Sequence, residues 1–308
     1  MMGAPPDEHE GDEHREVGDD GNPRAERASA GAGHLNSLAA PGAAVVIGAT
    51  ASVRPMTATP TDHRDAAALA TEAGQLLVAL RASLHAAGAD PAELRAEGDR
   101  SSHDFLVAAL AASHPDDAVL SEEGVDDPAR LAAERVWIVD PLDGTREFGE
   151  EGRTDWAVHV ALAIGGVVAA AAVALPARGL TLNASPAATL PPAHDGPPRL
   201  VVSRTRPPVI AQTLAERLGG ELVELGSAGA KAMAVVLGDV DVYAHSGGQY
   251  EWDSAAPVGV AAAAGLHVSR LDGAPLVYNR PEPYLPDLLI CRPELRDAVL
   301  AVTRAQPS

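Results

Sequence analysis

The sequence predicts a mixed protein of the α/β (α+β) class that is built in layers. Two amphipathic helical patterns come first, short apolar strand patterns follow, and strand and helix patterns then alternate to the end of the chain. Because each amphipathic element must bury one face, such a mixture is expected to stack into layers around a shared core. The 308 residues are 46% hydrophobic, which is enough to supply that core.

The first helix is expected from Asp62, as its N-cap, to about Gly88. Leucines recur at helical spacing between these two residues. They are Leu69, Leu76, Leu77, Leu80 and Leu84. A second helix is expected over 102–113, where apolar residues again fall on one face.

Short buried strands are expected at 118–120 and 136–140. The apolar stretch 156–177 contains the pair Gly165-Gly166, which suits the positive φ angles of a tight turn, so a buried hairpin is expected rather than a membrane span. Strand patterns at 199–204, 221–225, 241–245 and 287–292 then alternate with helical patterns at 207–218, at 228–237 and from Asp253 onward.

The composition changes near residue 60. Residues 1–60 are rich in Asp, Glu, Gly, Pro and Ala without any period, which is typical of a disordered acidic extension. Two explanations stay open: the extension is a real acidic tail, or translation begins at Met56. Residues 61–308 are expected to fold as one domain with halves at 61–197 and 198–308.

Net charge and cysteine content exclude several classes of protein. A formal charge of −20 argues against a nucleic acid polymer as partner, because binding a polyanion requires many Lys and Arg side chains. No signal peptide pattern and no membrane span is evident, so a cytoplasmic location is expected. The single cysteine, Cys291, is expected to be a buried apolar residue, because no intramolecular disulfide can form.

The most informative segment is 136–148, VWIVDPLDGTREF, in which a strand leads directly into two carboxylates. Asp140 is at the carboxyl end of that strand, where ligand sites of α/β sheets lie, and Asp143 and the Thr145 hydroxyl follow closely. Pro141 lacks an amide donor and is expected to hold the Leu142 carbonyl outward. Such a set of oxygen atoms suits a hard cation such as Mg²⁺.

Two other acidic segments are candidates for the same site. Glu122 follows the strand at 118–120, and Asp253 precedes an alanine-rich helix. For each a simpler explanation stays open, since Asp253 is suited to be only an N-cap and Glu122 to lie in a solvated turn. No histidine is assigned to metal, and His159 is expected to be a strand residue without a role.

Together, SEEG at 121–124, DPLDGTREF at 140–148 and WDSAAPVGVAAAAG at 252–265 resemble the inositol monophosphatase-like superfamily. The resemblance covers about residue 62 to the C-terminus. It implies a layered αβαβα sandwich, two or three Mg²⁺ ions, a small phosphorylated metabolite as substrate and a homodimer. The ligands that it implies are Glu122, Asp140, Asp143, Asp253 and the Leu142 carbonyl. The half 61–197 would then be the metal-site half, and 198–308 the substrate-side half.

In this superfamily a Thr and an Asp orient the attacking water, and a glutamate of the metal site takes part in catalysis. Thr145 and Glu122 match these positions, and Asp99 is the best candidate for the partner of Thr145. Because Glu97-Gly98 precede Asp99 where relatives carry Thr or Ser, a surface turn is the competing explanation for this aspartate.

The segment DGTREF is more similar to the 3′(2′),5′-bisphosphate nucleotidase branch than to the inositol branch. Ser246 stands where the inositol branch has an acid. Substrate contacts are therefore expected from Leu142, Asp143, Gly144, Thr145, Ser227 and Lys231. Lys231 is the only lysine in the chain and a compact charge for phosphate, although an incidental surface lysine is the alternative. Ser227 could help the following helix N-terminus to bind a second phosphate, or only cap that helix.

The resulting hypothesis is a Mg²⁺-dependent phosphatase for 3′-phosphoadenosine 5′-phosphate in sulfate assimilation, with 3′-phosphoadenylyl sulfate as a second candidate substrate. The alternatives are inositol monophosphatase or fructose-1,6-bisphosphatase activity. A third alternative, from another class, is a catalytically idle metal- or nucleotide-binding protein on the same scaffold.

Overall fold

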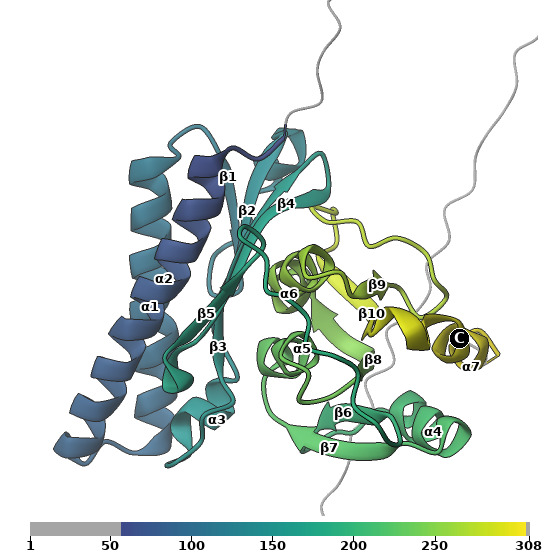
Figure 1. Ribbon diagram of the computed structural model, residues 1–308. Helices are drawn as coiled ribbons and strands as arrows, with labels where there is room; N and C mark the ends of the chain where they lie inside the picture. Colours follow the sequence, from purple (N-terminus) through teal and green to yellow (C-terminus); the bar gives the residue numbers. More distant parts are fainter. Residues whose placement is uncertain (1–56, 306–308) are drawn as a thin grey trace, which may run out of the picture. The chain divides into compact units, whose positions relative to one another are not determined.

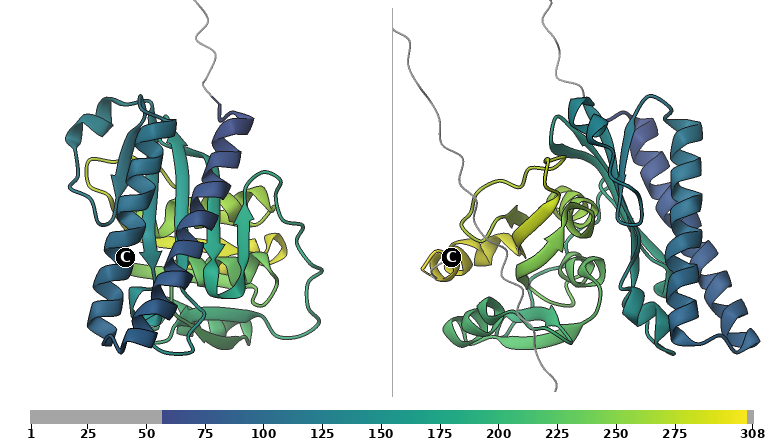
Figure 2. Two further views of the ribbon diagram at one scale, coloured as in Figure 1. Left: turned by 90° about the vertical axis from the view of Figure 1, so that its left-hand side faces the viewer. Right: turned by 180° about the vertical axis from the view of Figure 1, so that it is seen from behind.

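The computed structural model describes residues 57–305, which form two five-stranded sheets and the helices around them. Helices and sheets alternate in five layers, so the predicted αβαβα sandwich is confirmed (Figures 1 and 2). Of the extension expected at 1–60, residues 1–56 lie outside the described part of the chain. No helix among residues 57–305 combines the length and the apolar composition that crossing a bilayer requires.

Two long helices form the first outer layer: α1 (Pro60–Ala87) and α2 (Pro91–Ser113). Thr59, not Asp62, is the N-cap of α1, and Asp62 completes a capping box by accepting the Thr59 amide at 2.7 Å. Gly88 ends α1 in the left-handed conformation, as expected. The second helix begins well before residue 102, because Asp90 caps it and Pro91 fits its first turn.

The first sheet has the strand order β1-β2-β3-β4-β5, in which β1 and β2 are parallel and the other neighbours antiparallel. Its strands are β1 (Ala118–Ser121), β2 (Arg135–Asp143), β3 (Ala157–Ile164), β4 (Val167–Leu175) and β5 (Leu180–Asn183). The expected hairpin is confirmed as β3 and β4, with positive φ at both Gly165 and Gly166. Both faces of this sheet are covered, so β3 is buried along its whole length.

Helices α5 (Ala228–Val236) and α6 (Glu251–Ala263) fill the layer between the two sheets (Figure 1). Small side chains allow this close packing. A Cβ atom on Gly259 of α6 would come within 2.6 Å of side chains on β4. The alanine-rich composition therefore serves a core in which two helices are packed between two sheets.

The second sheet has the order β7-β6-β8-β10-β9. Its strands are β6 (Arg199–Ser203), β7 (Glu221–Leu225), β8 (Val242–Tyr250), β9 (His267–Ser269) and β10 (Tyr284–Cys291). Helices α4 (Val209–Leu218) and α7 (Arg296–Thr303) cover its outer face (Figure 2). Cys291 is fully buried at the end of β10, as expected.

Candidate active site

The candidate site is built around the carboxyl end of β2. The pairing of β2 with β3 is interrupted between Asp140 and Asp143, and this irregularity brings both carboxylates into one cluster, of which Asp143 lines the adjacent cavity. The Leu142 amide donates to Asp140 Oδ1 at 3.1 Å, and the Ser102 hydroxyl donates to the Pro141 carbonyl at 2.6 Å. The turn that carries the two aspartates is thus held from both sides.

Asp253 joins these two carboxylates from the other end of the chain. One oxygen atom from each of Asp140, Asp143 and Asp253 lies within 4.8 Å of the others. Asp253 is not the N-cap of α6: Tyr250 is, and Asp253 lies three residues into the helix, where one of its oxygens accepts the Tyr250 amide at 2.7 Å. The cap and the carboxylate cluster therefore share this residue.

Glu122 comes to the same place from the end of β1, because β1 is the parallel neighbour of β2. Its charge interacts with those of Asp140 and Asp253, although the residue is exposed and is not one of the three whose oxygens lie within 4.8 Å of one another. Shielding by the surrounding chain and the charge of Asp253 raise the pKa of Glu122 to about 7. Four acidic side chains from three separate segments therefore meet.

Such a cluster is electrostatically unfavourable without a cation. Burial and the charges of Glu122 and Asp143 raise the pKa of Asp140 well above its usual range. Burial and the charge of Asp143 raise the pKa of Asp253 to about 6. A divalent cation would relieve this repulsion, and oxygen-only donors are the set that Mg²⁺ prefers. The residues present therefore fit the metal that the sequence resemblance implies.

Asp143 differs from its neighbours because it accepts several hydrogen bonds at the N-terminus of α5. The Ser227 hydroxyl, the Ala228 amide and the Gly229 amide donate to it at 2.6, 3.0 and 2.5 Å. Burial alone would raise the pKa of Asp143, but His159, Lys231 and Ser227 outweigh it and lower that pKa to about 2. The helix N-terminus that was a candidate for a second phosphate is thus occupied by a carboxylate of the chain itself.

His159 has a role that the sequence analysis missed. It lies on β3 opposite Asp140, fully buried, with Nε2 at 3.1 Å from Asp143 Oδ2 and Nδ1 at 3.0 Å from the Trp252 carbonyl. Burial alone would lower the pKa of His159, but the charge of Asp143 outweighs it and raises that pKa. The sequence carried no direct signal for this contact, which depends on the register that places residue 159 of β3 opposite residue 140 of β2.

Thr145 and Asp99 are brought together, as the sequence predicts. Thr145 Oγ1 lies 3.1 Å from Asp99 Oδ1 and 3.0 Å from the Leu142 carbonyl. Asp99 is a residue of α2, so the alternative of a surface turn is wrong. Burial and the charge of Glu123 raise the pKa of Asp99 to about 6.

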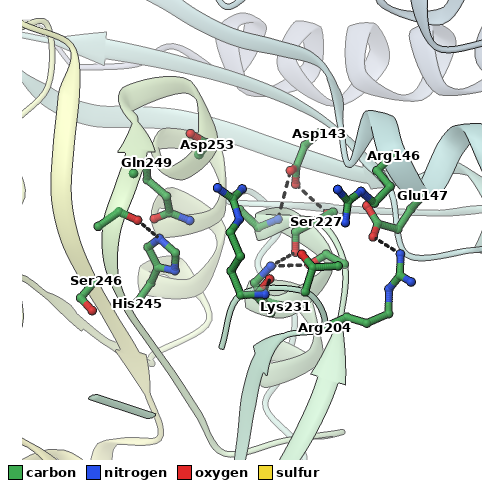
Figure 3. Close-up of a pocket in the computed structure, with 17 residues that line it drawn as sticks. Asp143, Arg146, Glu147, Arg204, Ser227, Lys231, His245, Ser246, Gln249 and Asp253 are labelled. Carbon is green, nitrogen blue, oxygen red and sulfur yellow. Dashed lines mark hydrogen bonds and ion pairs between the residues drawn. The ribbon is translucent and has the colours of Figure 1, made fainter. Parts of the chain in front are cut away.

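A cavity of about 460 Å³ opens beside the aspartates, between the end of β2 and the second sheet (Figure 3). Of the expected substrate residues, Asp143, Ser227 and Lys231 line it, and Ser246 does too. Gly144 packs against Ser227: a Cβ atom added at Gly144 would lie only 2.9 Å from the Cβ atom of Ser227. The lining also includes charged and amide side chains that the sequence analysis did not select: Arg146, Glu147, Arg204, Arg206, His245 and Gln249.

Lys231 is not a surface residue, since it is 6% exposed. Its ammonium group donates to the carbonyls of Gly226 and Ser227 and lies 5.5 Å from the centre of the Tyr243 ring. Lys231 therefore holds the loop that enters α5 and brings a positive charge to the cavity. On the opposite side of that loop, Arg204 donates to Glu147 at 2.8 Å.

Known proteins with similar sequences or similar folds are phosphatases or members of the CysQ and inositol monophosphatase groups. A 3′-phosphoadenosine 5′-phosphate phosphatase of Mycobacterium leprae is 53% identical over 257 residues, which are 79% of this chain and 94% of that protein. The crystal structure of CysQ from Bacteroides thetaiotaomicron has a TM-score of 0.64 at 26% identity, covering 75% of this chain and 97% of that one. Inositol monophosphatase II of Staphylococcus aureus has a TM-score of 0.66 at 21% identity, covering 77% and 91%.

The profile of one protein family spans nearly all of the described fold. Residues 59–190 and 198–306 match it, and the three acidic segments that meet at the cavity lie within these ranges. The chain therefore belongs to the inositol monophosphatase family.

Proposed function

We propose that this protein is a Mg²⁺-dependent phosphatase that releases the 3′-phosphate of 3′-phosphoadenosine 5′-phosphate and leaves the 5′-nucleotide. The observation that carries the proposal is the convergence of Asp140, Asp143 and Asp253 within 4.8 Å, next to a hydroxyl and carboxylate pair and a cavity with basic walls. The relative from M. leprae, named for this reaction, supports the choice of substrate.

The carboxylates would hold two or three Mg²⁺ ions, with Asp140, Asp143, Asp253, Glu122 and the Leu142 carbonyl as ligands. Bound there, the metal would lower the pKa of a water molecule, neutralise phosphoryl oxygens and stabilise the leaving oxygen. Because Ser227 and two amides already hold the Asp143 carboxylate, this ligand is fixed before substrate arrives. His159 lies behind it, with Nε2 at 3.1 Å from Asp143 Oδ2.

Thr145 and Asp99 supply the base and the orientation for the attacking water. When the Thr145 hydroxyl donates a hydrogen bond to Asp99, its lone pairs are left to accept a hydrogen bond from that water, and Asp99 is the final acceptor of the proton. Glu122, which is exposed and close enough to Asp140 for their charges to interact, would help to hold the metal at the edge of the site. This geometry gives each predicted catalytic residue a separate task.

The cavity beside the metal cluster suits a substrate with a second anionic group. Arg146, Arg204, Arg206 and Lys231 line it, with only Glu147 as an ion-pair partner of Arg204 in the same lining, in a protein whose formal charge is −20. Because the chain is acidic overall, this local group of cations is unlike the rest of its composition. A small bisphosphate is expected to bind there, and 3′-phosphoadenylyl sulfate, with an anion at the same place, is the second candidate. Both substrates belong to sulfate assimilation in the cytoplasm.

The test is phosphate release by the purified protein. With Mg²⁺, 3′-phosphoadenosine 5′-phosphate should be hydrolysed faster than inositol 1-phosphate or fructose 1,6-bisphosphate, and chelation of the metal should stop the reaction. A reversed ranking would favour the inositol or sugar phosphatase alternatives. Nucleotide binding without any Mg²⁺-dependent turnover would instead identify an idle binding protein.

A further inference from the structure

One wall of the cavity is formed by an irregular part of β8. Positive φ angles at Gly247 and Gly248 interrupt the strand, and its pairing with β10 shifts between Leu285 and Asp287. Two glycines can adopt these angles without strain, and the resulting bulge changes the direction of the side chains that follow. Gln249, the next residue, lines the cavity (Figure 3).

The Gln249 amide group is only half satisfied. The residue is 5% exposed, and Nε2 donates to the Tyr243 hydroxyl at 2.8 Å. Oε1 is buried and has no hydrogen-bond partner among residues 57–305. A buried carbonyl without a donor is destabilising, so a residue of this kind in a cavity wall indicates a contact that a ligand completes.

A second acceptor lies on the same wall. His245 Nε2 lies 2.9 Å from the Gly247 carbonyl, and since a carbonyl only accepts, this nitrogen carries the proton. Burial and the charge of Lys231 lower the pKa of His245 to about 4, so the ring is neutral near pH 7 and its Nδ1 is an acceptor. Two acceptors thus stand on this wall, while Arg204 and Arg146 lie on the opposite side (Figure 3).

The two sides of the cavity therefore suit different parts of a substrate, anionic groups on one side and hydrogen-bond donors on the other. The basic side attracts anions, whereas carbonyl and imine acceptors on the β8 wall can bind only groups that donate a hydrogen bond. A nucleotide offers two such donors apart from its phosphates: the ribose 2′-hydroxyl and the 6-amino group of adenine. A simple aryl phosphate such as phenyl phosphate has neither the 2′-hydroxyl nor the 6-amino group.

We propose that Gln249 is a specificity-determining residue whose Oε1 accepts a hydrogen bond from a donor on the nucleoside part of the substrate. The inference rests on the proposed function, because it takes a phosphorylated nucleoside as the ligand. A site built to bind a donor discriminates strongly against an analogue without it, since the buried acceptor is then left unpaired.

The experiment compares Gln249→Met with the wild type and with Gln212→Met, a control at an exposed position of α4. Four substrates are assayed with Mg²⁺: 3′-phosphoadenosine 5′-phosphate, its 2′-deoxy analogue, its analogue with hydrogen in place of the 6-amino group, and phenyl phosphate. The Gln249 variant should lower kcat/KM for the first substrate about tenfold, mainly through KM, and leave phenyl phosphate unchanged. The control should match the wild type throughout.

The analogue that lacks the donor bound by Gln249 has no contact left to lose, so wild type and variant should hydrolyse it equally well. The group missing from that analogue is therefore the donor. If Gln249→Met lowers kcat/KM equally for all four substrates, the residue has only a structural role. The inference is also overturned if kcat/KM does not fall for any substrate, or if it falls as much for both analogues as for 3′-phosphoadenosine 5′-phosphate. Should Gln249→Met not fold, Tyr243→Phe, which releases the other end of the amide, should give the same pattern at smaller size. A wild type without Mg²⁺-dependent turnover of the nucleotide would instead refute the proposed function.

Discussion

Thr145 Oγ1 on α3 (Thr145–Gly149) lies 3.1 Å from Asp99 Oδ1 on α2, although the two residues are 46 positions apart in the sequence. The contact joins the end of β2 to the outer helical layer. Through this contact the Thr145 hydroxyl has a proton acceptor, Asp99, at the edge of the carboxylate cluster. Because the two side chains depend on each other, single and double variants can test them together.

Asp99→Asn and Thr145→Ala should each lower kcat by about 10²–10⁴-fold, because each removes the pair that orients and deprotonates the attacking water. The double variant should be little worse than either single variant, since the two residues act together. Asp104→Asn is the matched control, on the same helix but exposed and, within the described part of the chain, paired only with Arg100. Losses that multiply in the double variant would argue that the two residues act separately.

Asp140→Asn should abolish Mg²⁺-dependent turnover and yet stabilise the metal-free protein. The neutral amide relieves repulsion with Glu122 and Asp143, and its oxygen can still accept the Leu142 amide. A gain of about 1 kcal/mol corresponds to a rise of about 2–4 °C in Tm for a chain of this size. Thermal unfolding with chelator and with Mg²⁺ measures both effects. The wild type should gain stability from Mg²⁺ and the variant much less; a variant less stable than wild type in chelator would contradict the repulsion argument.

Gly229→Ala should destabilise the protein, although the same exchange in an ordinary helix stabilises it by about 1 kcal/mol. A Cβ at this position would come within 2.1 Å of His159 Nε2 and 3.1 Å of Asp143 Oδ2. The expected cost is about 1–3 kcal/mol by denaturant unfolding, with a loss of activity because Asp143 must shift. Adding His159→Ala should recover part of the stability but not the activity. No recovery would mean that the strain lies elsewhere.

The Asp62–Arg135–Asp117 network should make stability depend on pH. Arg135 donates to Asp62 at 2.8 Å and to both oxygens of Asp117 at 2.8 and 2.9 Å. Burial alone would raise the pKa of Asp62, but Arg135 and Thr59 outweigh it and lower that pKa below its usual 3.8. Because the folded pKa is the lower one, the stabilisation is complete above the unfolded value and is lost as pH falls through the folded value.

Asp62→Asn should therefore cost stability at pH 6, by about 1–3 kcal/mol, and progressively less as pH falls below about 4. Denaturant unfolding at several pH values measures this difference. Asp297→Asn, at a 97% exposed side chain, is the control and should behave as wild type. A cost that does not change between pH 6 and pH 3 would show that the Asp62 charge contributes nothing.

The sequence alone determined the chemistry of the site and most of the elements. The strand that ends at Asp140, the hairpin at Gly165-Gly166 and the acidic segments at Glu122 and Asp253 are all local patterns, set by side-chain periodicity and by the few residues that suit turns and strand ends. Helix starts were less well determined: a residue with N-cap chemistry, such as Asp62 or Asp253, is equally suited to the third position of a capping box.

Only the tertiary structure decided how those side chains are supported. Asp143 accepts its hydrogen bonds from residues 84–86 positions away, and His159 is beside it because β3 pairs with β2. The same holds for the buried position of Lys231 and for the Gln249 oxygen, which has no partner in the part of the chain that the structure describes. Contacts of this kind depend on how sheets and helices stack, and periodicity carries no information about partners that are distant along the chain.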